Sequence, residues 1–223
     1  MNYKILAAAA AIALVGVLPA AAQEPRVEIS VLGGWTLSDG VEGDTVLGGD
    51  GNLYDRIDPK DSFNWGLQAA GLVSDGVEIG FLFNQQMTTF QVSGTATKDI
   101  GDTTINGYHG YIGYNLGDSS STVRPYIMIG AGATSYSGLS FTRANGQTQE
   151  IGGDTQFSTT WGAGVKIFPS PKVGLRMGMR WTPTYIKSDA EGYWCDPYWG
   201  CYTVGDAQYS NQWDFSGGIT FRF

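Results

Sequence analysis

Few residues of this chain could carry covalent chemistry: one histidine, His109, and two cysteines, Cys195 and Cys201. Nucleophilic catalysis through histidine needs a serine or cysteine within hydrogen-bond reach and an acid that orients the ring. The stretch His109-Gly110-Tyr111 offers no neighbouring serine. We therefore expect no catalytic residue, and an isolated histidine that lines a polar interior.

The two cysteines close a short aromatic segment near the end of the chain. In an exported protein such a pair indicates a disulfide, with a redox role as the alternative. A metal site is disfavoured because no histidine lies near, and we expect neither a metal nor a cofactor. The aromatic residues around the pair either bind a partner or pack on each other; they are Tyr193, Trp194, Tyr198, Trp199 and Tyr202.

Charged residues recur on one face of segments in which apolar and polar residues alternate. The last segment places Trp213, Phe215, Gly217, Ile219, Phe221 and Phe223 on one face, and Asp214, Ser216, Gly218, Thr220 and Arg222 on the other. Alternation with period two is typical of strands. It recurs near 26–36, 62–73, 77–88, 105–116, 123–135, 157–168, 172–184 and 213–223. Eight such segments of membrane-spanning length predict an all-β, eight-stranded antiparallel transmembrane up-and-down β-barrel.

The polar faces of these segments would point into the barrel. An eight-stranded barrel is only wide enough for side chains to fill it, and buried charges must pair. We expect Glu28 to lie near Arg222 at one rim, and Arg180 near Asp214 at the other. The predicted lumen is a salt-bridged plug formed by Glu28, Glu78, Lys166, Arg176, Arg180, Asp214 and Arg222, with His109 beside them.

The connections between segments alternate in length. Those near 74–76, 117–122 and 169–171 are short, whereas those near 37–61, 89–104, 136–156 and 185–210 are long. Short periplasmic turns and long extracellular loops are the known asymmetry of membrane barrels, so both mature termini are expected in the periplasm. Five tryptophans lie at the strand ends that join the long loops, and they predict an aromatic girdle at the membrane surface: Trp35, Trp65, Trp161, Trp181 and Trp213. In a soluble β-sandwich nothing would place these tryptophans at the same height.

The start of the chain indicates export. One basic residue, an apolar stretch over 5–17 and small residues over 19–22 predict a signal peptide at 1–22, followed by a barrel domain over 23–223. The formal net charge of −8 argues against nucleic acid as a partner. The acidic first loop contains Asp50, Asn52 and Tyr54, but it lacks the glycine of a calcium loop and is read as a solvated loop.

Several patterns resemble the small eight-stranded outer-membrane barrels. They are Val173–Arg176 after a proline-rich turn, Arg124-Pro125-Tyr126 before Gly130 and Gly132, and the terminal Phe223. The chain is similar to the barrel domain of outer-membrane protein A and to adhesion and invasion barrels. The resemblance implies a location in the outer membrane of a Gram-negative bacterium, with its lipids and the barrel assembly machinery as partners. It also implies that Phe223 is read as an assembly signal.

Three functions remain open at this point. The first is a structural or surface-interaction barrel, whose four extracellular loops bind an unknown ligand and whose lumen is largely closed. The second is a narrow porin-like channel. The third, a lipid-modifying barrel enzyme, would place a histidine with a serine and an acid on the lipid-facing side, whereas His109 is expected to face inward.

Overall fold

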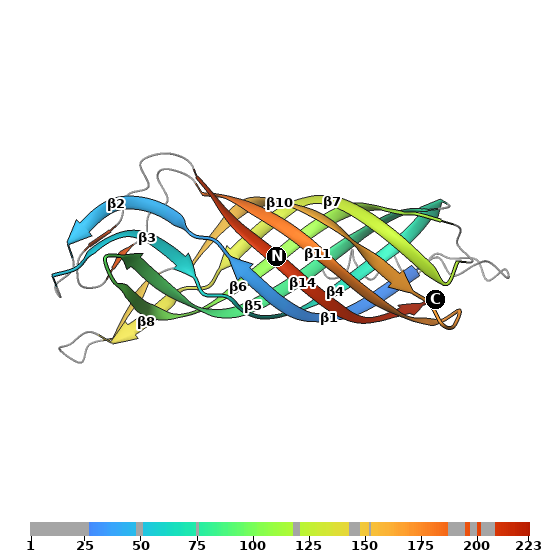
Figure 1. Ribbon diagram of the computed structural model, residues 1–223, viewed down its shortest axis with the longest axis horizontal. Coiled ribbons are helices and arrows are strands. Elements are labelled where there is room, and N and C mark those ends of the chain that lie inside the picture. Colours follow the sequence, from blue (N-terminus) through green and yellow to red (C-terminus); the bar gives the residue numbers. More distant parts are fainter. Residues whose placement is uncertain are drawn as a thin grey trace, which may run out of the picture.

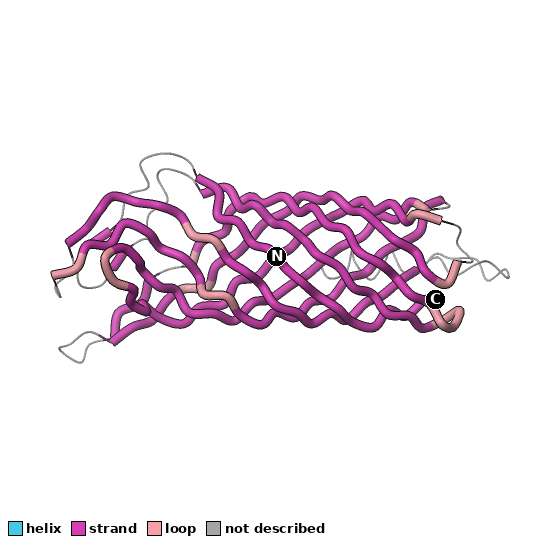
Figure 2. The backbone as a smooth tube through the Cα atoms, viewed as in Figure 1, coloured by secondary structure: helices cyan, strands magenta, loops and turns pink. Residues whose placement is uncertain are grey.

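The structure is a computed structural model that describes residues 27–47, 51–74, 76–117, 121–142, 148–151, 153–186, 195–196, 200–201 and 208–223. Regular structure within these ranges is entirely β-strand (Figure 2). No helix among the described residues is long and apolar enough to cross a membrane.

Eight strands close into one antiparallel barrel, which confirms the predicted fold class. Each pairs with its sequence neighbour in the barrel, and β1 closes the ring against β14 from Glu28↔Arg222 to Ser38↔Gln212. Closure satisfies the backbone groups that an open edge would leave unpaired. The barrel strands are β1 (Val27–Ser38), β4 (Ser62–Ser74), β5 (Val77–Gly94), β6 (Thr97–Asn115), β7 (Val123–Tyr136), β10 (Asp154–Ile167), β11 (Val173–Ile186) and β14 (Gln208–Arg222) (Figure 1).

The barrel is inside-out compared with a soluble protein. On β1, Ser30 is 1% exposed whereas the adjacent Val31 is 50% exposed, and the same contrast holds for Gln68 and Leu67 on β4. Successive side chains of a strand point to opposite faces, so the alternation in the sequence becomes a polar interior and an apolar outer wall. An apolar outer wall is stable where lipid surrounds it.

The two ends of the barrel differ. At one, the short-turn end, strands are joined by tight connections; Gly76 adopts φ 91° in the turn between β4 and β5, a conformation that suits glycine. At the other, the extended end, further strands continue the sheet: β2 (Val41–Leu47) pairs with β3 (Leu53–Pro59), and β3 pairs with β5 (Figure 1). Shorter pairs are β8 (Leu139–Thr142) with β9 (Thr148–Ile151), and β12 (Cys195–Asp196) with β13 (Gly200–Cys201).

The long connections expected over 37–61 and 89–104 consist largely of β-strand. The first contains β2 and β3, and the second is taken up by the ends of β5 and β6, which pair as far as Ser93↔Thr97. The reason lies in β5, whose two faces exchange character along its length. Between the short-turn end and Met87, the outer face of β5 carries apolar residues such as Ile79 and Phe81. Between Met87 and the extended end, the outward residues are polar: Thr89, Gln91 and Ser93. In that part of the strand the apolar residues Phe90 and Val92 face inward.

This exchange marks the level at which the strand leaves lipid for water. A sequence prediction that requires apolar residues on the same face throughout a strand ends the strand where the outer face becomes polar. The hydrogen-bonded ladder nevertheless continues, because in water the apolar residues pack inside the sheet and the polar residues face out.

Candidate functional site in the barrel interior

Six buried charged residues form one network near the short-turn end, which we call the lower network. All are less than 10% exposed, and they come from six different strands. Each strand contributes through an inward position, so closure of the barrel is what brings them together. The lower network consists of Glu28, Glu78, Arg124, Lys166, Arg176 and Arg222.

Glu28 is the centre of one half of the lower network. Arg124 Nη2 and Arg222 Nε both donate to Glu28 Oε1 at 2.9 Å, and Lys166 Nζ donates to Oε2 at 2.6 Å. Since the two arginines share one oxygen, their guanidinium groups lie close together. The expected contact between Glu28 and Arg222 is therefore present, with two further cations on the same carboxylate.

Glu78 is the centre of the other half. It accepts from Lys166 Nζ, accepts from Asn115 Nδ2 at 3.0 Å, and lies 3.6 Å from Arg176 Nη1. Space for this side chain depends on Gly113 on the neighbouring strand, where a Cβ would lie 2.7 Å from Glu78 Cγ. Lys166 thus bridges the two carboxylates and joins both halves.

Two aromatic rings support the cations of the lower network. The Arg176 guanidinium lies 4.0 Å from the centre of the Tyr126 ring, and the Arg222 guanidinium lies 3.1 Å from the centre of the Phe168 ring. Arg124 also faces Phe168, at 5.2 Å. Stacking on an aromatic face stabilises arginine in a poorly hydrated site.

Sequence reasoning missed Arg124. Alternation alone could have found it, because Arg124 lies two positions before the buried Tyr126 and must share its face. With Arg124 included, the lower network holds two carboxylates against four cationic side chains.

A second group of polar residues, the upper network, centres on Asp214. Arg180 donates to Asp214 Oδ2 through Nε at 3.1 Å and through Nη2 at 2.5 Å. Thr36 and Asn64 donate to the other oxygen, Oδ1, at 2.5 and 3.1 Å. The carboxylate is thereby satisfied on both oxygens, as a buried charge requires.

His109 is not isolated, contrary to our expectation. Its Nε2 lies 2.8 Å from the Oγ atom of Ser158 on β10. The two residues are 49 positions apart in the sequence, and the register of the strands brings them together. Thr134 donates to the same serine oxygen at 3.0 Å, and Thr184 donates to Thr134 at 3.1 Å. His109 Nδ1 has no hydrogen-bond partner among the described residues, so no described acid completes a catalytic triad there.

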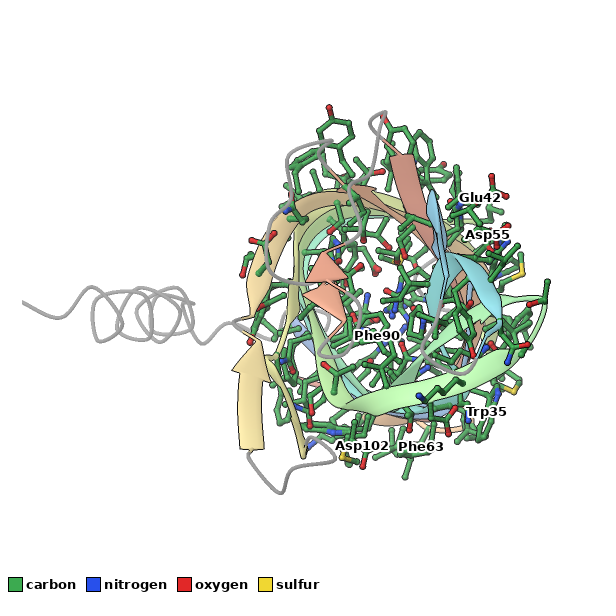
Figure 3. All side chains as sticks on the ribbon, turned by 90° about the vertical axis from the view of Figure 1, so that its left-hand side faces the viewer. Trp35, Glu42, Asp55, Phe63, Phe90 and Asp102 are labelled. Carbon is green, nitrogen blue, oxygen red and sulfur yellow. The ribbon has the colours of Figure 1, made fainter. Side chains whose placement is uncertain are left out.

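The five tryptophans of the predicted girdle face outward near the level where β5 changes faces. Trp161, Trp181 and Trp213 stand side by side in register on β10, β11 and β14, with the last two rings stacked at 5.8 Å. Trp65 packs edge-on against Phe83 at 5.4 Å, and Trp35 is 50% exposed. Figure 3 shows Trp35 outside the ring of strands and Phe90 inside it.

The remaining predicted sites are only partly described. Tyr193, Trp194, Tyr198, Trp199 and Tyr202 lie outside the described residues, as does the predicted signal peptide. Cys195 and Cys201 are directly opposite each other in the β12–β13 pair, and their disulfide stays a prediction. Phe223 donates from its backbone N to Val27 O at 2.9 Å at the seam between β14 and β1. The described part of the chain contains no cluster of three or more metal-binding side chains.

The comparison with protein families decides what kind of barrel this is. Residues 7–223 match the model of the outer membrane protein beta-barrel domain. The chain belongs to this family. Its apolar outer wall and aromatic girdle therefore face an outer membrane, in agreement with the location expected from the sequence. None of the curated proteins matches the chain in sequence.

Solved structures agree on the fold. The outer membrane protein OprG from Pseudomonas aeruginosa superposes with a TM-score of 0.58 at 14% identity, covering 90% of this chain and 97% of that one. Neisserial surface protein A superposes with a TM-score of 0.52 at 13% identity, covering 88% and 97%. At such identities the likeness concerns the fold alone.

Proposed function

We propose that this protein is a surface-interaction barrel of a Gram-negative outer membrane, with its extended end outside the cell and both mature termini in the periplasm. The observation that carries the proposal is the exchange of faces on β5. A sheet that turns its polar side outward and its apolar side inward is built for water, and it extends the barrel beyond the membrane as a folded structure.

The extended end has an apolar core of its own. Tyr54, Ile57, Phe90, Val92 and Ile105 are each at most 4% exposed, and they come from β3, β5 and β6. The Phe90 and Tyr136 rings lie 6.3 Å apart across the interior. Packing of this kind fixes the shape of the platform, and a preorganised surface loses less entropy when it binds a partner.

The surface of the extended end is acidic. Figure 3 shows Glu42, Asp55 and Asp102 on its outer side. The basic side chains of its described residues are Arg56, Lys60 and Lys98; Arg56 pairs with Asp39, and Lys60 pairs with Asp99. A partner with a basic surface fits this charge best. The exposed acids among its described residues are Asp39, Glu42, Asp55, Asp61, Asp99 and Asp102.

The burial of the lumen side chains supports a largely closed interior. Buried side chains of the lower network and of the upper network fill the interior, and within each network they hydrogen-bond one another. An eight-stranded barrel is expected to be filled in this way. We infer that the resting barrel conducts weakly or not at all. The alternative, a narrow porin-like channel, requires a large and steady conductance from the unmodified protein in a planar bilayer.

The binding role is tested with the full chain in lipid vesicles. Labelled oligolysine should bind native protein and be displaced by salt, while labelled heparin should not bind. The matched variant replaces Asp55, Asp99 and Asp102 with asparagine, which keeps size but removes charge, and we expect it to bind several-fold more weakly. Equal binding by both proteins, or preference for heparin, would contradict an acidic docking platform.

A further inference from the structure

The outer wall of the barrel, which faces lipid, contains a groove of about 540 Å³. It crosses β6, β7, β10, β11 and β14, beside the three tryptophans that stand in register. Every residue that lines the groove is a glycine or has an apolar or aromatic side chain. Small-molecule sites in proteins have volumes of about 300–1,000 Å³. The groove is therefore large enough for a ligand, and that ligand must be apolar.

The groove exists because one small residue stands among large ones. Ala163 on β10 is directly opposite Ile127 on β7 and Met179 on β11. Two residues closer to the extended end, Trp161 and Trp181 stand side by side on β10 and β11. The methyl group of Ala163 is thus the floor of the groove, and the larger side chains form its walls.

The tryptophan wall is held in a fixed shape. Trp181 Nε1 donates to Asn211 Oδ1 at 3.1 Å, and Trp161 Nε1 donates to Thr159 Oγ1 at 3.4 Å. Both acceptors lie toward the extended end, so the indole N–H groups point away from the floor of the groove. The Trp181 ring also stacks on Trp213 at 5.8 Å. A wall that is ordered before binding lowers the entropy cost of holding a ligand.

The width of the groove fits a single hydrocarbon chain. Ile127 and Met179 stand on the strands that flank β10, which are two interstrand spacings or about 9–10 Å apart. An α-helix with its side chains is about 10–12 Å wide, so it cannot reach the floor between them. Apolar surfaces associate in lipid through close packing, and an unfilled groove loses these contacts. An acyl chain of the surrounding lipid supplies them.

The wall between the groove and the extended end indicates which lipid supplies the chain. Its nearest outward residues on β10, β11 and β14 are Thr159, Pro183 and Asn211, followed on the last two strands by Tyr185 and Tyr209. No arginine or lysine is among these positions. The phosphates of lipid A are best bound by such cations. A phospholipid whose phosphate is balanced by its own ammonium group needs none.

We propose that the groove over Ala163 binds one acyl chain of phosphatidylethanolamine. The headgroup lies beside Thr159 and Asn211, and the chain runs over Ala163 toward the short-turn end. Because the groove is rigid and narrow, this lipid stays with the barrel when detergent removes the rest of the bilayer. The site does not depend on which partner the extended end binds.

The site is tested by native mass spectrometry of the full chain refolded in detergent with dipalmitoyl phosphatidylethanolamine. The native chain should retain one lipid. Ala163→Phe fills the groove and should weaken binding about tenfold. The matched control Ala69→Phe makes the same change at an outward alanine of β4, outside the groove, and should bind like the native chain. Dipalmitoyl phosphatidylglycerol, which has the same chains but a net negative charge, and lipid A should both bind more weakly.

A second measurement does not depend on the folding of a variant. In perdeuterated detergent, the protonated acyl chain of the bound lipid should give NOEs to the methyl groups of Ile127 and Ile129. Ile29 and Ile79 are also exposed on the outer wall but lie outside the groove, and should give none. A native chain that retains no lipid, equal binding by the two alanine variants, stronger binding of phosphatidylglycerol or lipid A, or equal NOEs at all four isoleucines would each overturn the proposal.

Discussion

At the scale of single residues, the interior is governed by how completely each buried charge is satisfied. Asp214 accepts from Arg180, Thr36 and Asn64, so its two oxygens are fully used. The attraction between Arg180 and Asp214 adds little net stability, because both charges lose their hydration. Removing one partner is costly, because the other charge is then buried without a counter-charge.

Replacement of Arg180 by glutamine should therefore lower barrel stability by about 3–5 kcal/mol, because Asp214 keeps only neutral partners. The temperature at which refolded protein loses its compact form on SDS gels measures the effect. Lys60→Gln is the matched control: it breaks an exposed pair with Asp99 and should cost about 1 kcal/mol or less. Similar losses in both variants would mean that the buried pair has no special weight.

Phe223 acts at the seam of the barrel. Its backbone exchanges hydrogen bonds with Val27 at 2.9 and 3.2 Å, but its side chain is 67% exposed. Deletion should reduce refolding into detergent only mildly, since an apolar side chain contributes about 1.5–3 kcal/mol when fully buried. If Phe223 is also an assembly signal, outer-membrane yield in cells should fall far more than refolded yield. Equal mild losses in both assays would make it a seam and girdle residue only.

At the scale of elements, β5 belongs to two environments. Its lower half turns Ile79 and Phe81 outward, and its upper half buries Phe90 and Val92. One strand thus serves as a membrane wall and as part of a water-soluble fold, and β3 is held to it over Tyr54↔Gly94 to Pro59↔Phe90.

Phe90→Ala should destabilise the extended end by about 3–5 kcal/mol, the usual cost of deleting a buried aromatic ring. Amide hydrogen exchange should speed up in β2 and β3 and stay unchanged in the membrane-spanning part of β1. The control Met87→Ala truncates an outward side chain that is 58% exposed, and should change neither. Uniform acceleration through the barrel would mean that the two halves of β5 do not unfold separately.

The β12–β13 pair supports a prediction about the cysteines. Cys195 and Cys201 are opposite in register, so a disulfide would close this hairpin. Mass spectrometry of protein purified without reductant should find them joined, whereas two free thiols would contradict the prediction. Replacement of both by serine should leave barrel assembly intact, because the hairpin lies outside the ten-stranded sheet.

At the scale of the whole molecule, closure gives the barrel its resistance to denaturation. Every barrel strand is paired on both sides, and the seam from Glu28↔Arg222 to Ser38↔Gln212 leaves no open edge in the membrane. Unfolding in detergent must break these ladders together.

Unboiled protein should accordingly migrate faster on SDS gels than boiled protein, and it should fractionate with outer membranes. The shift in mobility is the measurement, and the boiled sample is its control. Purification as a soluble monomer with one mobility would be incompatible with the barrel.

The sequence by itself determined the eight strands, the closed barrel and the faces of Glu28, Arg180 and Asp214. It could do so because lipid on one side imposes a strict period of two. Prediction from the sequence failed in the segments that lipid does not surround. β2, β3 and the upper half of β5 lie in water, so their apolar residues face inward and the pattern changes sign.

Adjacent strands allowed the sequence to predict that Glu28 meets Arg222 and that Arg180 meets Asp214, but only the tertiary structure decided which side chains meet across the barrel. Arg124 and Lys166 converge on Glu28, and Ser158 reaches His109, through the ring closure and register of the barrel. Alternation states that a residue faces inward but not at what height or toward which strand. Those depend on strand tilt and stagger, which are set jointly by all eight strands.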